Sequence, residues 1–170
     1  MNQFVFALLA CAVTTGALFA ADTKTTAVPG NDDLSRYVAT KAAPGGQTTL
    51  RGASGRTVGT ASTVGSRTTT FRDSSGRTTG TAITQGSQTV FRDAAGRTVW
   101  TATTSGNKTV TYRDAAGRTQ QTASESGSGI TFRDAAGRTT STVQRNGSSA
   151  AARDASGRMI GTSSTTGTKR

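Results

Sequence analysis

The sequence predicts an all-β fold in which six tandem strand-turn-strand repeats of about 20 residues form a β-hairpin array or a β-solenoid, after a cleaved signal peptide and a short leader. Three observations predict it. An eight-residue motif, such as FRDAAGRT, recurs six times from residue 50 in steps of 20 or 21 residues. Each copy carries a glycine at its sixth position and a second glycine ten residues later. The runs between these glycines are rich in Thr, Val and aromatic residues, which favour strands.

The first 20 residues predict a signal peptide that is removed on export. Residues 4–21 carry no charge and end in small residues, while the strongly apolar part, residues 4–13, is too short to span a bilayer. We therefore expect no transmembrane span in the mature chain. The Leu-Leu-Ala-Cys run ending at Cys11 is similar to a lipobox, so a lipoprotein acylated on Cys11 is the alternative.

Residues 21–49 predict a flexible leader with one short helix over 32–42. Pro and Gly bound this segment, Asp32 and Asp33 lie where a helix dipole favours negative charge, and Leu34, Tyr37 and Val38 fall on one helical face. Such a short helix is marginal alone. Two interpretations stay open: the helix caps the open end of the repeats, or the whole leader is a linker.

The six repeats occupy residues 50–170, and each contains two turns. An Asp-x-x-Gly sequence favours a type I turn with a left-handed fourth residue, because Asp accepts backbone bonds and glycine takes a positive φ without strain. The second glycine of each repeat marks the other hairpin turn. The expected structural turn residues are Asp73, Gly76, Asp93, Gly96, Asp114, Gly117, Asp134, Gly137, Asp154 and Gly157.

Alternation of side chains along a strand predicts the two faces of the sheet. Counting across the turn places Phe91 opposite Val99, and Val90 opposite Trp100 on the other face. One large apolar side chain per repeat is too little to bury alone, so a solenoid or barrel, a second copy or a ligand must cover it. The expected apolar ladder is Phe71, Phe91, Tyr112 and Phe132. The arginine face is expected to hold the small residues Ala61, Ala82, Ala102 and Ala123.

The composition argues against an enzyme. Leu, Ile, Val and Phe make up 24 of 170 residues, there is no His, and the one Cys lies in the predicted signal peptide. The commonest bases, nucleophiles and soft metal ligands are therefore missing, and one Asp per repeat offers too few oxygen ligands for Ca²⁺. We expect no catalytic residue, cofactor or metal site. So low an apolar content also favours disorder of the repeats without a partner.

The period and the D-x-x-G-R core, first complete at residues 73–77, resemble the YD repeats of RHS-type secreted and surface proteins. In that family a Tyr stands directly before the Asp, where this chain has Arg72 or its equivalents. The resemblance implies β-hairpins that join into a long curling sheet and mediate shielding or surface contact. A looser likeness is to curlin-type fibre subunits, which also follow a signal peptide and leader with strand-turn-strand repeats.

Arginine is the residue that the repeat supplies most. The repeats contribute twelve arginines and five aspartates, or +7 of a net charge of +11. Stacked repeats would align unpaired arginines about 10 Å apart and attract a polyanion. Another interpretation is that Arg and Asp stabilise turns and discourage edge pairing. The candidate anion-binding residues are Arg72, Arg92, Arg113, Arg133 and Arg153.

Two functions from different classes follow. The first is an exported, non-catalytic binding or structural module that contacts an anionic surface or partner in the periplasm, on the cell surface or after secretion. An anionic polysaccharide, lipopolysaccharide or another protein fits this function. Nucleic acid is less supported, because the aromatics that would stack bases are expected on the other face. The alternative is a self-assembling extracellular fibre subunit whose sheet ends join chain to chain.

Overall fold

The computed structural model describes residues 32–41, 44–65, 67–106 and 108–167. The predicted signal peptide, Cys11 and the leader as far as residue 31 lie outside the described residues. One helix, α1 (Asp32–Lys41), occupies the segment where the sequence favours a helix. The first strand begins at Gln47, three residues before the first repeat motif.

Twelve strands make up the rest of the described chain, and their lengths alternate between six and eight residues. They are β1 (Gln47–Gly52), β2 (Thr57–Val64), β3 (Thr68–Asp73), β4 (Thr78–Gln85), β5 (Gln88–Asp93), β6 (Thr98–Ser105), β7 (Thr109–Asp114), β8 (Thr119–Ser126), β9 (Gly129–Asp134), β10 (Thr139–Asn146), β11 (Ser149–Asp154) and β12 (Met159–Thr166). Each pairs antiparallel with its neighbours in sequence, so the all-β prediction is confirmed.

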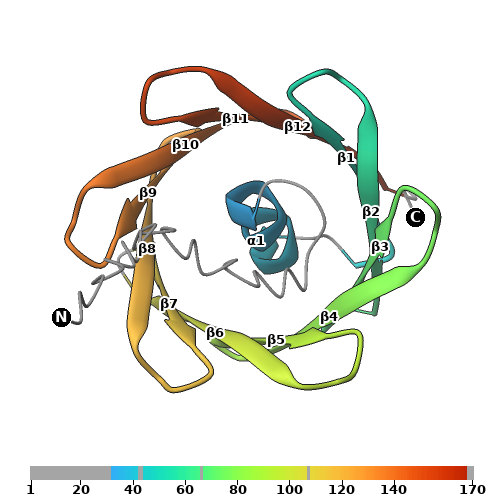
Figure 1. The fold of residues 1–170 in the computed structure, drawn as a ribbon, viewed down its shortest axis with the longest axis horizontal. Coiled ribbons are helices and arrows are strands. Elements are labelled where there is room, and N and C mark those ends of the chain that lie inside the picture. Colours follow the sequence, from blue (N-terminus) through green and yellow to red (C-terminus); the bar gives the residue numbers. More distant parts are fainter. Residues whose placement is uncertain (1–31, 42–43, 66, 107, 168–170) are drawn as a thin grey trace, which may run out of the picture.

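The sheet closes into a barrel, and the prediction of an open array or solenoid is wrong (Figure 1). Between neighbouring repeats, Ala61 lies opposite Phe71 and Ala82 opposite Phe91. At the seam between the last strand and the first, Ser163 lies opposite Leu50 in the same register. The last and first repeats therefore pair at the seam in the same way as any two neighbouring repeats. Closure buries the aromatic ladder within a single chain, so no second copy or ligand is needed to cover it. It also removes the two sheet edges that an open array would expose.

A bulge in each of the six hairpins closed by an Asp-x-x-Gly-type turn shifts the register expected from the sequence. Phe91 pairs with Trp100 and Val90 with Thr101, because the pairing slips by one residue between Phe91 and Arg92. The predicted pairing of Phe91 with Val99 is therefore wrong. An extra residue beside the turn is what a bulge inserts, and it offsets the following strand by one position.

The same offset moves the small residues to the inner face. Ala82 lies directly opposite Phe91 and is 1% exposed. Small side chains beside each ring leave room for the aromatic ladder on the concave face. The alanines expected on the arginine face instead line the barrel interior: Ala61, Ala82, Ala102 and Ala123.

The aromatic ladder lies in the core, and its four side chains are among the most deeply buried of the described residues. Phe71, Phe91, Tyr112 and Phe132 are each at most 1% exposed. The Tyr112 ring lies 6.5 Å from that of Phe91 and 6.2 Å from that of Phe132, both in tilted contact. Such tilted pairs contribute beyond the area they bury.

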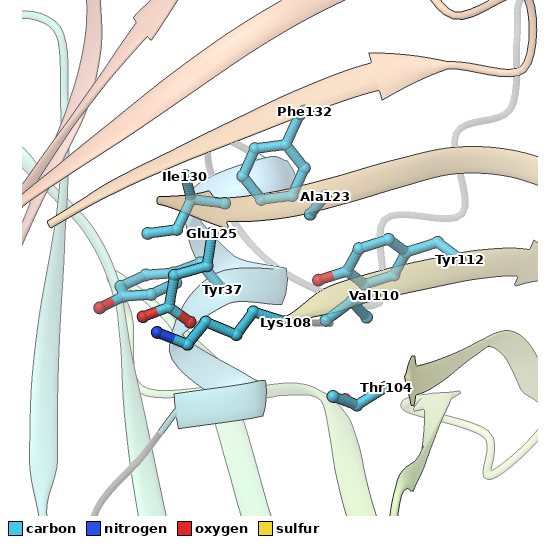
Figure 2. Close-up of a pocket in the computed structure, with 9 residues that line it drawn as sticks. All are labelled: Tyr37, Thr104, Lys108, Val110, Tyr112, Ala123, Glu125, Ile130 and Phe132. Carbon is cyan, nitrogen blue, oxygen red and sulfur yellow. The ribbon is translucent and has the colours of Figure 1, made fainter. Parts of the chain in front are cut away.

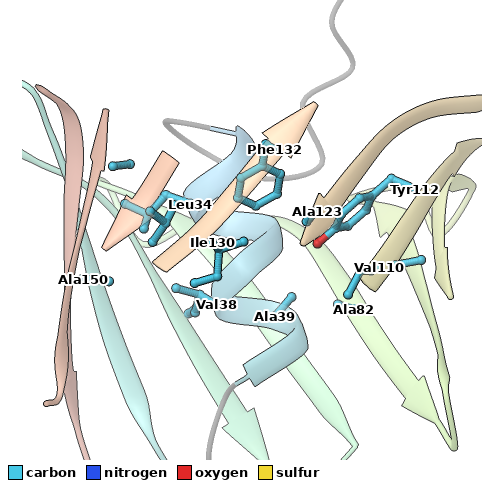
Figure 3. Packing of buried hydrophobic residues seen from close by; sticks show 14 of the residues in the cluster. Leu34, Val38, Ala39, Ala82, Val110, Tyr112, Ala123, Ile130, Phe132 and Ala150 are labelled. Atoms are coloured by element: carbon cyan, nitrogen blue, oxygen red, sulfur yellow. The ribbon is translucent and has the colours of Figure 1, made fainter. Parts of the chain in front are cut away.

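Helix α1 lies inside the barrel (Figure 1). Leu34, Val38 and Ala39 are buried and belong to the same apolar cluster as the wall residues Ile130 and Ala150 (Figure 3). The helix lies within the lumen and its apolar side chains are buried there, so the described residues 32–41 neither cover an open end nor form a flexible linker. A twelve-stranded barrel is wider than its own short side chains can fill. The helix therefore supplies apolar surface that the repeats lack.

Parts of the lumen wall are polar, and their hydroxyl groups form hydrogen bonds with one another. Threonine hydroxyls meet across neighbouring strands, as between Thr63 and Thr69 at 3.0 Å and between Thr48 and Thr165 at 2.8 Å. Thr48, Thr63 and Thr69 are buried. Because each hydroxyl has a partner, the interior tolerates these polar groups.

Candidate functional site: the arginine end of the barrel

The barrel topology gathers the six Asp-x-x-Gly-type turns at one end. These turns join each six-residue strand to the following eight-residue strand, and consecutive strands run in opposite directions. All six therefore lie at the same end, and the second-glycine turns lie at the other. We call this the arginine end; it comprises residues 51–57, 72–78, 92–98, 113–119, 133–139 and 153–159.

The turn after β5 shows the common geometry. The Gly96 amide donates to the carbonyl of Asp93 at 3.0 Å, and the Asp93 amide donates to the carbonyl of Arg97 at 2.9 Å. Gly96 has a φ of +81°, which glycine adopts without strain. The Asp93 carboxylate accepts bonds from the amides of Ala95 and Arg97, each at 2.9 Å. The carboxylate thus closes the turn from inside.

The third residue of the turn decides what else the carboxylate binds. Where that residue is alanine, the arginine after the glycine donates Nε to the second carboxylate oxygen, as Arg97 does to Asp93 at 2.8 Å. Where it is serine, as Ser75, the hydroxyl donates to Asp73 at 2.7 Å. Where the third residue is alanine, the arginine after the glycine forms an ion pair with the turn carboxylate. Where it is serine, the hydroxyl binds the carboxylate and this ion pair is not formed. The three ion pairs join Asp93 to Arg97, Asp114 to Arg118 and Asp134 to Arg138.

The arginine at the second position of each repeat motif points back to its own turn. Arg92 Nη1 donates to the carbonyl of Gly96 at 3.1 Å, and the other five copies make the same bond at 2.9 to 3.2 Å. None of these guanidinium groups forms an ion pair with a carboxylate of the described residues. The six are Arg51, Arg72, Arg92, Arg113, Arg133 and Arg153.

The turn carboxylates are held in the charged form. The pKa of Asp73 is lowered chiefly by the Ser75 hydroxyl, and that of Asp93 chiefly by the Arg97 amide. At Asp114 desolvation is the largest effect and raises the pKa, but the hydrogen bonds within the turn outweigh it. The pKa is lowered at all five: Asp73, Asp93, Asp114, Asp134 and Asp154.

Charge is unevenly distributed between the two ends. The arginine end carries twelve arginines and five aspartates. At the opposite end the described charged residues are Arg67, Lys108, Glu125 and Arg145, of which the last two form an ion pair. Among the described residues, positive charge is therefore concentrated at the arginine end.

A second cluster of polar side chains, inside the barrel, was not predicted from the sequence. Arg36 on α1 donates to Oε1 of Gln121 at 2.7 Å, pairs with Asp33 at 3.3 Å and lies over the Trp100 ring at 4.1 Å. Asp33 also accepts from Ser141 Oγ at 2.6 Å and from Gln121 Nε2 at 2.9 Å. This buried network holds the helix against the wall.

A break in the repeat marks the wall side of this cluster. The position opposite each ladder residue is glycine in three repeats, as at Gly59 and Gly80, but it is Trp100, Gln121 and Ser141 in the other three. These are the side chains that contact α1. The replacement of glycine at this position is visible in the sequence and marks these three repeats as different. It does not indicate that their side chains contact α1.

A small pocket lies beside α1 towards the opposite end (Figure 2). Its volume is about 30 Å³, and aromatic and aliphatic side chains form its base while Lys108 and Glu125 lie near Tyr37. Burial raises the pKa of Tyr37, Arg145 opposes the rise and Glu125 adds to it. A space of this size holds a few atoms or waters, well below the volume of typical ligand sites.

Two features are missing from the described residues. No helix among them is both long and apolar enough to cross a membrane. No three His, Cys, Asp or Glu side chains among them gather where they would hold a metal ion. Comparison with protein families, curated proteins and solved structures finds no match to this chain. Its function is therefore inferred from its own geometry.

Proposed function

We propose that this chain is an exported, non-catalytic module that binds an anionic partner through its arginine end. The observation that carries the proposal is the ring of six arginines, from Arg51 to Arg153, that are anchored to their turns and have no carboxylate partner among the described residues. Each keeps guanidinium donors for a phosphate, sulfate or carboxylate.

Anchoring lowers the entropy lost on binding. A free arginine loses rotamer freedom when it binds an anion, whereas each of these six already makes a bond to its own turn through Nη1. An anionic polysaccharide, lipopolysaccharide or an acidic protein surface offers the matching charges. The five turn aspartates have a structural role here, since every one of them accepts bonds within its own turn.

The fibre alternative requires the barrel to open. Both ends of the sheet are used in the β1–β12 seam, where six residue pairs are in register. The aromatic ladder that would stack between chains is buried, with Phe71 and Phe132 at 0% exposure. A fibre joined through sheet edges would first have to break this seam, so we rank it second. The resemblance to YD repeats likewise stays a prediction.

The test is binding to heparin, a soluble polyanion, by two variants that lose the same charge. The double variant Arg92→Gln/Arg113→Gln removes two of the anchored arginines, and Arg67→Gln/Lys108→Gln removes two positive charges at the opposite end. We expect the first to weaken binding about tenfold, which corresponds to about 1.4 kcal/mol, and the second to change it less than about twofold. Circular dichroism verifies that both fold.

Equal losses in the two variants would show that net charge alone attracts the polyanion. Absence of heparin binding by the unaltered protein at low salt, where exposed charges are least screened, would overturn the proposal. Growth of large assemblies in place of binding would move the fibre alternative to first place.

A further inference from the structure

We infer that the arginine end docks flat on an anionic phospholipid surface, with the barrel axis along the membrane normal. This inference rests on the proposed function and names the partner of the same site. Three properties of the barrel lead to it: the turns lie in one plane, the ring is closed, and few of the described residues at the opposite end are charged.

The first property follows from the registers. Every ladder residue pairs in the same way within its hairpin, as Phe71 with Gly80 and Phe132 with Ser141. Every repeat also meets the next in one register, including the seam between Ser163 and Leu50. Each repeat is therefore related to the next by the same movement, and after six such movements the chain returns to the first repeat. Such a movement is a rotation about the barrel axis without translation along it. The six turns therefore lie at one height around the barrel.

The second property separates a surface from a polymer. The unpaired arginines are spaced by two strands, about 10 Å, around a closed circle. A linear polyanion lying across such a ring contacts one arc of it at a time. A plane of phosphate headgroups contacts all six arginines together, because they stand at the same height. The geometry therefore matches a flat array of anions better than a chain of them.

The side chains next to the ring indicate the depth of contact. On the outer face, each unpaired arginine lies opposite a threonine of the preceding repeat, as Arg72 opposite Thr60 and Arg51 opposite Thr162. Val64 is the large hydrophobic side chain that stands exposed among the described residues, at 73%, and it lies at the opposite end. The arginine end thus offers charge and hydroxyl groups to headgroups, and contact stays at the headgroup level.

The third property sets the orientation. The opposite end presents Arg67 and Lys108 as its unpaired described charges, against the six unpaired arginines of the ring. Each basic residue near an anionic membrane strengthens binding about fivefold. Counted over the described residues, this fivefold factor applies more times to the arginine end than to the opposite end, so docking by the arginine end is favoured.

The experiment measures co-sedimentation of the protein with vesicles of phosphatidylcholine containing about 30% phosphatidylglycerol. Two triple variants lose the same charge in different patterns. Arg72→Gln/Arg92→Gln/Arg113→Gln clears one arc, and Arg72→Gln/Arg113→Gln/Arg153→Gln removes every second arginine around the ring. For end-on docking on a plane, we expect both to weaken binding by the same factor, about 100-fold.

The controls separate the lipid surface from the polyanion. Vesicles of phosphatidylcholine alone should not bind, and Arg67→Gln/Lys108→Gln should bind anionic vesicles within about twofold of the unaltered protein. Heparin binding by the two triple variants should differ, since the arc variant keeps three neighbouring arginines for a linear chain.

Three outcomes would count against the inference. Heparin binding without vesicle binding would overturn docking on lipid and leave the proposed function standing. Vesicle binding that tolerates the arc variant but not the alternating one would overturn the flat, end-on orientation. Failure of both ligands would overturn the inference together with the proposed function.

Discussion

Replacing Arg36 by alanine tests whether α1 is held in the lumen by its buried polar network. Arg36 is 8% exposed, and the contacts that its side chain loses include the 2.7 Å bond to Gln121, the ion pair with Asp33 and the stacking over Trp100. The change takes the Arg36 guanidinium away from the Asp33 carboxylate inside the barrel. Breaking a buried ion pair costs about 3–5 kcal/mol.

The lower end of that range applies here. Asp33 keeps its bonds from Ser141 and Gln121, which still stabilise its charge after the change. We therefore expect the free energy of unfolding to fall by about 3 kcal/mol. For a chain of this size, the midpoint of thermal unfolding would fall by about 6–12 °C.

The assay is urea unfolding followed by tryptophan fluorescence. Trp100 is the one tryptophan of the chain and lies directly under the Arg36 guanidinium, so its emission reports on the site itself. Arg158→Ala is the control, because this exposed arginine lies in a turn and forms no ion pair with a carboxylate of the described residues. We expect it to change stability by less than about 0.5 kcal/mol.

The reasoning fails if Arg36→Ala and the control unfold at the same urea concentration. A second variant separates charge from packing. Asp33→Asn/Arg36→Met removes both charges and keeps apolar volume beside Trp100, so it should recover most of the lost stability. If the double variant is as unstable as Arg36→Ala, the ion pair is not the source of the loss.

Three further predictions concern the ladder and its turns. Phe91→Ala should lower the free energy of unfolding by about 3–5 kcal/mol in urea unfolding, because a fully buried ring is lost. Gly96→Ala should cost about 1–2 kcal/mol in the same assay, since φ is +81° there, whereas Gly106→Ala, with no positive φ, should cost less. The lowered pKa values of the turn aspartates stabilise the fold above their ordinary pKa of about 4, and this contribution is lost as pH falls through the folded-state pKa. Urea midpoints should therefore fall below about pH 4, and Asp93→Asn should reduce that fall.

Local sequence determined the hairpins. The Asp-x-x-Gly turns follow from residues within five positions of one another, as the bonds among Asp93, Ala95 and Gly96 show. The alternation that buries Phe71 and exposes Arg72 is equally local. These features were predictable because glycine conformation, Asp bonding and strand alternation need no distant partner.

The register across each hairpin was only partly predictable. The position of the bulge, between Phe91 and Arg92, decides that Trp100 and not Val99 faces the ring. One residue of slip moves a whole strand to the other face. The alanines were misplaced for this reason, although the ladder itself was assigned correctly to one face.

Closure of the barrel and the place of α1 were decided by tertiary structure alone. Six repeats close because the seam reuses the register of the other interfaces, a property of the whole ring that no single repeat contains. The contacts that hold the helix join Arg36 to Gln121 and Asp33 to Ser141, which are 85 and 108 residues apart. A local pattern shows that Gln121 departs from the repeat, but its partner is specified only when the closed wall brings it to the helix. The physical reason is that turn formation depends on neighbouring backbone groups, whereas closure and lumen packing depend on the accumulated geometry of all twelve strands.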